Sequence, residues 1–339
     1  MTQSPCSVSA VSPTGQTRCY DAVGREIPCP DSGQDAAVAK CPGAADRFVS
    51  AGPGLVRDRA TGLVWPVDAG IGGFPMPWQD ALRLTARLAA EGHLGRVDWR
   101  LPNRRELRSL VSYGAARPAL PGGHPFQNVF SGWHWSATTA APATAYAWYV
   151  HLEGGRMFYG KKDQDCLCWP VAGTCLLPRT GQTRCFDAAG QPIACPGTGQ
   201  DGELRSGRPW PSPRFHQDGT GVLDRLTGLR WAARADVAGG LVDWSEALAA
   251  ARTFQGGGWR LPTINELETL VDADHAFPAL PAGHPFTAVG EAYWSSTTSA
   301  FDPAWAHALY LHKGAVGVGI KTASEFLVWP VSGPGEGAG

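Results

Sequence analysis

Two acidic clusters in this 339-residue chain are candidates for metal binding. They are Asp163-Gln164-Asp165 and Asp272-Ala273-Asp274-His275. Calcium takes roughly six to eight oxygen ligands, and neither cluster supplies enough of them. The sequence therefore predicts no metal site.

A cysteine pair offers a second possible centre. Cys166 and Cys168 stand two residues apart on an expected strand, which would place both sulfurs on one face. Two soft thiolates could hold a soft metal ion, although simple disulfide bonding explains these cysteines more economically. No Gly-x-Ser-x-Gly, His-Glu-x-x-His or phosphate-loop motif is present. We therefore predict no catalytic residues, no enzyme activity and no cofactor.

Other cysteines indicate structural disulfides. The segment from Cys19 to Cys29 recurs from Cys185 to Cys195, and each has a glycine that marks a turn between two short extended arms. Such a hairpin brings its two thiols opposite each other, and closing the ring would add roughly 2 to 3 kcal/mol. The spacing lacks the Cys-x2-Cys pattern of a zinc site. We predict the disulfides Cys19–Cys29 and Cys185–Cys195, which favour an oxidising compartment.

An odd number of cysteines remains. Cys6 and Cys175 precede their hairpins at similar distances, so they are candidate equivalents. At least one thiol must be free or intermolecular. The sequence leaves the pairing of these five open: Cys6, Cys41, Cys166, Cys168 and Cys175.

Tryptophans could stack on sugars or on partner proteins. Most of them fall on helical stripes or beside turn signatures, and for these we predict core packing: Trp65, Trp78, Trp99, Trp169, Trp231, Trp244, Trp259 and Trp329. The others lack a clear counterpart or align with another residue type, so we expect them at the surface: Trp133, Trp148, Trp210 and Trp305.

Three further residue types repeat at matched positions. His124 and His284 lie in Gly-His-Pro-Phe loops, where a structural role is favoured over ligand recognition. Arg100 and Arg260 follow tryptophans, and we expect each to anchor a buried carboxylate or carbonyl network. Lys161 and Lys321 occupy matched positions near the last strand and are weaker candidates for an anionic ligand.

The elements that position these residues come from a duplication. Asp58-Arg59-Ala60-Thr61-Gly62-Leu63-Val64-Trp65 recurs as Asp224-Arg225-Leu226-Thr227-Gly228-Leu229-Arg230-Trp231, and Trp169-Pro170-Val171 recurs as Trp329-Pro330-Val331. A period this long indicates tandem globular modules that could fold separately, whereas a solenoid repeat is much shorter.

Each repeat begins with helical signals and ends with strand signals. Apolar residues at helical spacing follow Trp78 and Trp244, and a capping-box pattern begins at Asn103, Thr263 and Asp243. Alternating segments such as 146–152 and 305–311 follow, separated by glycine turns. Helices followed by short antiparallel strands indicate an α+β fold.

Composition narrows the function classes. The formal net charge is −1 with 17% charged residues and no basic run, so nucleic acid is not an expected partner. No apolar stretch approaches the roughly 18 residues of a membrane-spanning helix. No signal peptide is visible at Met1 to Ala10, so we expect either an intracellular chain or a mature form whose leader was removed, and the cysteine spacing favours the second.

The order of motifs resembles a known family. Thr-Gly-Leu-x-Trp, a helix, Trp-Arg-Leu-Pro-Thr-x-x-Glu-Leu, Tyr-Trp-Ser-Ser-Thr and a terminal strand are similar to the domain typified by the C-terminal domain of the Legionella collagen-like adhesin. The second copy is closer to this pattern, because the first has His134 where Tyr293 fits the family.

The resemblance implies a fold and a domain layout. Its family is grouped with C-type-lectin-like folds, so we expect two tandem C-type-lectin-like modules, each with two helices and short antiparallel strands behind a disulfide hairpin. The expected ranges are an N-terminal tail at 1–12, the first repeat with its hairpin at 13–172, the second repeat with its hairpin at 173–332 and a C-terminal tail at 333–339.

The resemblance also implies a function. It implies a non-catalytic, bacterial, adhesin-like protein of the extracellular space or cell envelope that binds a glycan or a surface protein. The alternative is a structural subunit of a surface fibre, which could be a homo-oligomer linked by the odd cysteine. A third alternative is a copper oxidase like the formylglycine-generating enzymes. The candidate ligand-binding residues are His124, Trp133, His134, Tyr146, Trp148, His284, Tyr293, Trp305, His307 and Lys313.

Overall fold

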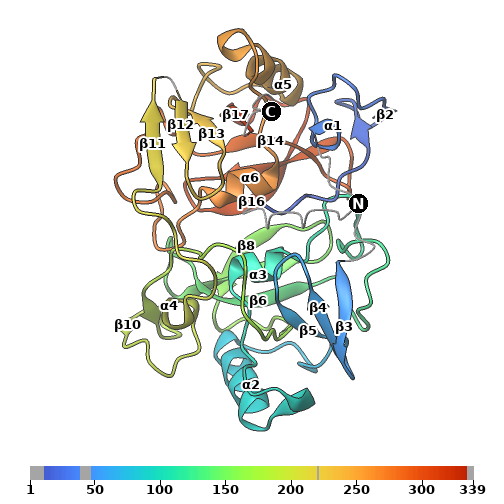
Figure 1. Cartoon of the computed structure of the whole chain (residues 1–339), viewed down its shortest axis with the longest axis vertical. Coiled ribbons are helices and arrows are strands. Elements are labelled where there is room, and N and C mark those ends of the chain that lie inside the picture. Colours follow the sequence, from blue (N-terminus) through green and yellow to red (C-terminus); the bar gives the residue numbers. More distant parts are fainter. Residues whose placement is uncertain (1–10, 39–46, 220, 334–339) are drawn as a thin grey trace, which may run out of the picture.

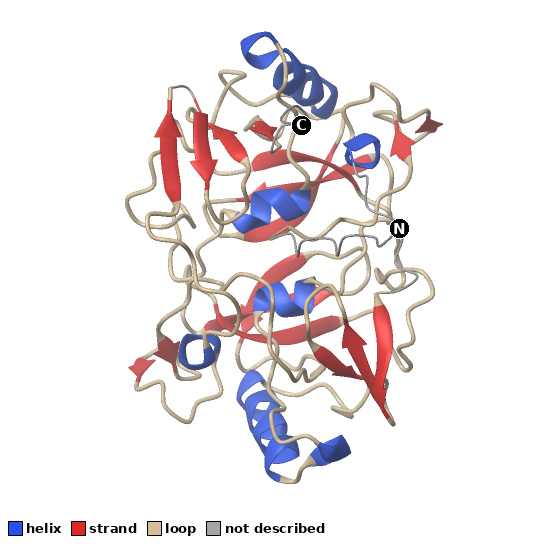
Figure 2. Cartoon of the chain, in the orientation of Figure 1, coloured by secondary structure: helices blue, strands red, loops and turns tan. Residues whose placement is uncertain are grey.

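The structure, a computed structural model, describes residues 11–38, 47–219 and 221–333. It is a mixed α/β protein with short helices and several small antiparallel sheets (Figure 2). We call residues 47–172 copy one and residues 214–332 copy two. Residues 13–38 are hairpin one, and residues 179–205 are hairpin two.

The two copies contain the same elements in the same order, except that copy two ends in a further short strand, β17. Those of copy one are β3 (Phe48–Gly52), β4 (Leu55–Asp58), β5 (Val64–Pro66), α2 (Trp78–Ala90), α3 (Arg104–Arg108), β6 (Trp133–Thr139), β7 (Tyr146–His151) and β8 (Met157–Lys161). Those of copy two are β11 (Phe215–Asp218), β12 (Gly221–Asp224), β13 (Arg230–Ala232), α5 (Trp244–Thr253), α6 (Ile264–Thr269), β14 (Tyr293–Thr298), β15 (Trp305–Tyr310), β16 (Ala315–Ile320) and β17 (Val331–Ser332). A single 3₁₀ turn follows the first helix of each copy, at His93–Gly95 and Phe254–Gly256.

The hairpins also match each other. Hairpin one contains β1 (Cys19–Tyr20), β2 (Glu26–Ile27) and α1 (Asp35–Val38), and hairpin two contains β9 (Cys185–Phe186), β10 (Pro192–Ile193) and α4 (Asp201–Leu204). The disulfides Cys19–Cys29 and Cys185–Cys195 close them, as predicted. Cys166, Cys168 and Cys175 are buried free thiols, while Cys6 and Cys41 lie outside the described residues.

Local sequence explains where the helices begin. The Asn103 side chain accepts hydrogen bonds from the backbone N–H groups of Arg105 and Glu106, and the Glu106 carboxylate accepts one from the Asn103 N–H. Thr263 and Asp243 form the same reciprocal cap on α6 and α5. Each cap satisfies N–H groups that the first helical turn leaves without partners. The three predicted capping boxes are confirmed.

The tryptophans predicted for the core are all buried. Trp65 packs edge-to-face on Trp169 at 5.6 Å between ring centroids, and Trp231 packs in the same way on Trp329 at 5.5 Å. Arg100 and Arg260 also behave as expected. Each forms a two-pronged ion pair with a capping glutamate, Glu106 or Glu266.

The central sheet joins the two copies. Its strand order is β14-β15-β16-β8-β7-β6, and the copies meet where Val316 of β16 pairs with Met157 of β8 (Figure 1). One apolar core cluster continues across this junction and includes Trp148 and Val150 of copy one with Leu309 and Val316 of copy two. The two modules are therefore joined by a shared sheet and a shared core cluster, and each copy also has smaller core clusters of its own.

Hairpin one packs on copy two. Its Asp35 accepts a hydrogen bond from Thr297 at 2.6 Å, and the Gln16 side-chain amide donates to the Thr298 carbonyl at 2.6 Å. The buried Lys321 donates to the Asp21 carbonyl at 3.2 Å. In Figure 1 this blue segment, with α1, accordingly lies beside β14 of copy two.

Hairpin two packs on copy one through equivalent contacts. Asp201 accepts from Thr138 at 2.6 Å, Gln182 donates to the Thr139 carbonyl at 2.8 Å, and Lys162 donates to the Asp187 carbonyl at 3.0 Å. The sequence had suggested that each hairpin belongs with the repeat that follows it. In the structure each hairpin instead docks mainly on the other copy, so the packed units differ from the contiguous ranges.

Candidate functional site

Four of the ten candidate ligand-binding residues are core residues. Their exposed fractions are at most 1%, so no ligand can reach their side chains from solvent: His134, Trp148, Tyr293 and His307. The placement of these four on a solvent-facing surface, including the expected exposure of Trp148, is therefore wrong. Both faces of the central sheet are covered here, and strand alternation does not bring these side chains outward.

The buried four have structural contacts. His134 Nδ1 lies 3.0 Å from the Gly132 carbonyl oxygen, and burial lowers its pKa to about 4. His307 packs edge-to-face on Tyr113 at 4.6 Å, and burial lowers its pKa to about 3. The Arg104 guanidinium carbon lies over the Trp148 ring, 4.0 Å from the ring centroid. Both histidines are therefore neutral packing groups.

The remaining candidates are half-buried and do not form one cluster. His124 and His284 stack on Phe126 and Phe286 within their own loops, at 5.8 and 5.9 Å between ring centroids. That contact agrees with the favoured structural role. Trp133 packs on Tyr149, and Tyr146 packs on Tyr159. Lys313 lies in the tight turn between β15 and β16, where its backbone N–H donates to the Tyr310 carbonyl at 3.1 Å. Trp305 alone among the ten lines a cleft described for this structure.

That cleft lies where the copies meet, and we call it the inter-copy cleft. Its volume is about 240 Å³. Copy one supplies the turn between β7 and β8, and copy two supplies the loop between β14 and β15, the first residue of β15 and Val318 of β16. The lining residues are Glu153, Gly154, Arg156, Ser299, Phe301, Asp302, Trp305 and Val318.

Tight backbone geometry shapes both walls. Gly154 has φ of +83°, and a Cβ at this position would lie 3.3 Å from the Cβ of Phe301, so glycine lets the two turns approach. On the other wall, Asp302 accepts a hydrogen bond from the Ala304 N–H at 3.0 Å, and the Asp302 carbonyl accepts one from the Trp305 N–H at 3.0 Å. This turn presents Phe301 and the Asp302 carboxylate to solvent.

The cleft combines apolar ring faces with a few polar groups. Phe301 is 49% exposed, which is unusual for a large aromatic side chain. Arg117 donates to Glu153 at 2.8 Å and lies 4.7 Å from the Phe301 ring centroid, so it steadies both residues. Within the described residues, no hydrogen-bond partner is present for the Arg156 guanidinium. Aromatic rings beside hydrogen-bond acceptors and an unpaired guanidinium donor are typical of a site for a small ligand.

The equivalent position in the other copy is built differently. The copies align here with an offset of 159, so Tyr159 corresponds to Val318, Pro142 to Phe301, and Tyr146 to Trp305. The Tyr159 ring packs on Tyr146 at 5.9 Å and on Trp148 at 5.1 Å. Tyrosine therefore occupies space that the small Val318 leaves open in copy two.

The sequence reasoning missed Glu153, Arg156, Phe301 and Asp302. Their signal was available in the alignment of the two copies, because Phe301-Asp302-Pro303 stands where copy one has Pro142-Ala143-Thr144. The cleft is formed by residues in which the two copies differ.

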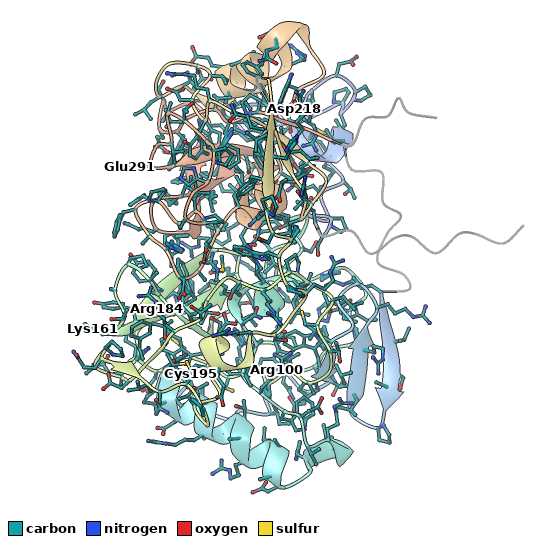
Figure 3. All side chains as sticks on the ribbon, turned by 60° about the vertical axis from the view of Figure 1, so that its left-hand side comes forward. Arg100, Lys161, Arg184, Cys195, Asp218 and Glu291 are labelled. Carbon is teal, nitrogen blue, oxygen red and sulfur yellow. A yellow bond between two sulfur atoms is a disulfide. The ribbon has the colours of Figure 1, made fainter. Side chains whose placement is uncertain are left out.

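The prediction that Lys161 matches Lys321 is wrong by one residue. Lys162, not Lys161, is the structural equivalent of Lys321, since both are buried and each lies over a tryptophan ring, at 4.2 Å from Trp78 and 4.0 Å from Trp244. Burial lowers the pKa of Lys162 to about 8 and that of Lys321 to about 7. Their ammonium groups hold the hairpins, whereas Lys161 is exposed and points outward (Figure 3).

Metal and thiol chemistry receive little support. Across residues 11–38, 47–219 and 221–333, no group of three or more His, Cys, Asp or Glu side chains is placed to hold a metal ion. Burial raises the pKa of Cys166 and of Cys168 to about 12, which keeps both thiols protonated. None of the described helices is long and apolar enough to cross a bilayer.

Comparison with known proteins gives one match. The family model of the Lcl C-terminal domain matches residues 54–172 and 220–332, which together make up more than half of the chain. Each segment covers one copy from after its first strand, and neither includes a hairpin. No curated protein and no solved structure matched the chain.

Proposed function

The chain belongs to the Lcl C-terminal domain family, with two tandem domains, and from this premise we propose that it is a non-catalytic, adhesin-like binding protein that holds a carbohydrate ring in the inter-copy cleft. The exposed Phe301 beside Trp305, in a cleft with two carboxylates and a guanidinium, is the observation that supports this best.

The cleft chemistry favours a neutral sugar. Aromatic faces suit the apolar face of a pyranose, and Glu153, Asp302 and Ser299 offer acceptors for hydroxyl groups, while Arg156 offers a donor. Glu153 is already paired with Arg117, so the charges of the site nearly balance. With a formal net charge of −1 for the whole chain, attraction of a polyanion is not favoured.

Size favours a sugar ring over a protein surface. The cleft volume of about 240 Å³ is below the roughly 300 to 1,000 Å³ of sites for drug-sized ligands. A specific protein interface buries on the order of 800 Å² on each partner, which requires far more surface than this cleft. One sugar ring, or the terminal residue of a longer glycan, is the ligand that we propose.

The proposed location is the extracellular space or the cell envelope, and the proposed fold of each copy is C-type-lectin-like. Two disulfides in small hairpins support an oxidising compartment. The family match supports an adhesin-like role. Both proposals rest on family membership together with these bonds.

A fibre subunit linked by disulfides has less support. Cys166, Cys168 and Cys175 are buried, so none of them can reach another chain without local unfolding. Cys6 and Cys41 lie outside the described residues. We therefore favour ligand binding over covalent assembly.

A glycan array probed with the full chain, followed by calorimetry on the best neutral oligosaccharide, tests the proposal. We expect neutral glycans to bind with little salt dependence. Trp305→Ala should weaken binding at least tenfold, or about 1.4 kcal/mol. The matched control is Tyr146→Ala, which changes the equivalent residue of copy one and should leave the affinity unchanged.

Two results would overturn the proposal. One is an array without any neutral-glycan signal. The other is equal weakening by Trp305→Ala and Tyr146→Ala, which would show that the inter-copy cleft is not the site. Preference for sulfated polymers with a steep salt dependence would instead indicate an electrostatic surface.

A further inference from the structure

The contact between the two copies is built around a pair of short helices, α3 and α6, that face each other across the junction (Figure 1). Glu268 of α6 is 4% exposed and lies within 3.5 Å of three arginines of α3. The three contacts are Arg104 at 3.5 Å, Arg105 at 3.3 Å and Arg108 at 3.5 Å. All three arginines are themselves buried.

Backbone carbonyls and side chains of copy two complete this network. Arg105 donates to the carbonyls of Thr269 and Val271 at 3.2 and 2.8 Å, where the last turn of α6 leaves oxygens without helical partners. Arg108 donates to the Asn265 side chain at 2.7 Å. Arg104 donates to the Gly314 carbonyl. The donors of copy one thus meet acceptors of copy two.

The duplicated positions do not have the same charge. With the helix offset of 160, Arg104 corresponds to Ile264, Arg105 to Asn265, and Arg108 to Glu268. The face of copy one therefore has three cations where copy two has one anion and two uncharged residues. The capping glutamates do not change this balance, because each is already paired with its own arginine.

This difference penalises pairing between identical copies. Copy one against copy one would bury six arginines without the glutamate that neutralises them. Copy two against copy two would bury two Glu268 carboxylates without the arginines of α3, since the nearby Arg214 is already paired with Asp224. Leaving a buried charge without its partner is strongly destabilising, and like charges at close range add to the penalty.

We propose that the two copies are a copy-selective pair: the α3 face of copy one accepts the α6 face of copy two and rejects a second copy one. Each chain then closes on itself, because the covalent linkage gives the correct partner a high effective concentration. The exchanged hairpins reinforce the closure, since hairpin one holds copy two and hairpin two holds copy one.

The pairing of copy one with copy two also forms the inter-copy cleft. The inter-copy cleft requires Glu153 and Arg156 from copy one beside Phe301 and Trp305 from copy two. Neither same-copy pair would combine these residues. The selective pair therefore gives one such cleft for each chain, whatever ligand occupies it.

Charge reversal in the full chain tests the proposal. Glu268→Arg imitates copy one facing itself, and Arg108→Glu imitates copy two facing itself. We expect the wild-type chain to be a monomer by sedimentation that unfolds in one cooperative denaturant transition. Each reversal should lower the midpoint of that transition, and the double variant Arg108→Glu with Glu268→Arg should unfold at a higher denaturant concentration than Glu268→Arg alone.

Milder variants keep the test decisive if a reversal prevents folding. Glu268→Gln removes the charge with little change in shape and should also lower the midpoint. Arg83→Glu, which reverses an exposed charge on α2, is the control and should leave it unchanged. Two separate transitions in the wild type would overturn the proposal. So would a midpoint for Glu268→Gln equal to that of the control, or a double variant no more stable than Glu268→Arg.

Discussion

The hairpin docking sites and the inter-copy surfaces show opposite outcomes of one duplication. The docking sites are nearly the same in both copies: a buried aspartate between threonines, a glutamine that bonds a strand carbonyl, and a lysine that bonds the hairpin. The helix faces and the cleft differ at most positions. What holds each copy together is repeated, and what distinguishes one copy from the other lies where they meet.

The largest effect should come from the buried ion pairs that the copies share. Glu106→Gln should destabilise the protein by about 3 to 5 kcal/mol, because Arg100 then stays buried without its carboxylate. Glu266→Gln should cost less, since Arg260 is more exposed and Glu106 also accepts a hydrogen bond from Ser206 at 2.8 Å. Chemical denaturation of the two variants measures the difference. Equal losses would contradict the stronger role that we assign to Glu106.

Removal of each disulfide comes next and tests the hairpin exchange. Replacing Cys19 and Cys29 by alanine, or Cys185 and Cys195, should cost roughly 2 to 3 kcal/mol. Hydrogen exchange then locates the damage. Loss of the first disulfide should reduce protection in β14 of copy two, and loss of the second should reduce it in β6 of copy one. The reverse pattern would mean that each hairpin serves its own repeat.

Each of the two buried aspartates predicts a pH effect on stability on the order of 3 kcal/mol. Burial raises the pKa of Asp201 to about 6 from an ordinary value near 3.8, so the folded protein binds this proton more tightly than the unfolded chain. That contribution to stability is fully present below about pH 4 and is lost as the pH rises through about 6. The stability of the wild type relative to Asp201→Asn should therefore fall between pH 4 and pH 7.

The variant must be compared with the wild type at each pH, because the pH dependence of other groups changes stability in the opposite direction. His134 and His307 have depressed pKa values, so their stabilising contribution is lost as the pH falls below about 6.5. Comparing two proteins that both contain these histidines cancels their effect. Asp35→Asn should reproduce the trend of Asp201→Asn, because burial also raises the pKa of Asp35 to about 6. A difference from wild type that stays constant with pH for both variants would contradict the raised pKa values of Asp35 and Asp201.

The smallest effect on stability should come from giving copy two a residue of copy one at a position that lines the cleft. Val318→Tyr gives copy two the ring that copy one has at Tyr159 and should fill the inter-copy cleft. Because Val318 is only half-buried, we expect the free energy of unfolding to change by no more than about 0.5 kcal/mol. Glycan affinity, measured by calorimetry, should nevertheless fall at least tenfold. Unchanged affinity would separate the ligand site from this cleft.

Local features of this protein could be read from the sequence. The caps at Asn103 and Thr263, the disulfides, the buried tryptophans and the pairing of Arg100 with a carboxylate all depend on neighbours a few residues away or on a repeated motif. The burial of His134 and His307 could not be read in this way. It depends on which elements cover each face of the central sheet.

The amino-acid sequence by itself determined the duplication, the family, the element order within each copy and the disulfides. Only the tertiary structure decided which hairpin docks on which copy, since Asp35 and Asp201 fit nearly identical sites and local sequence cannot distinguish them. It also decided that Glu153 meets Phe301 across the junction. Both outcomes depend on contacts between residues more than a hundred positions apart, and such contacts form only when the two copies close into one core.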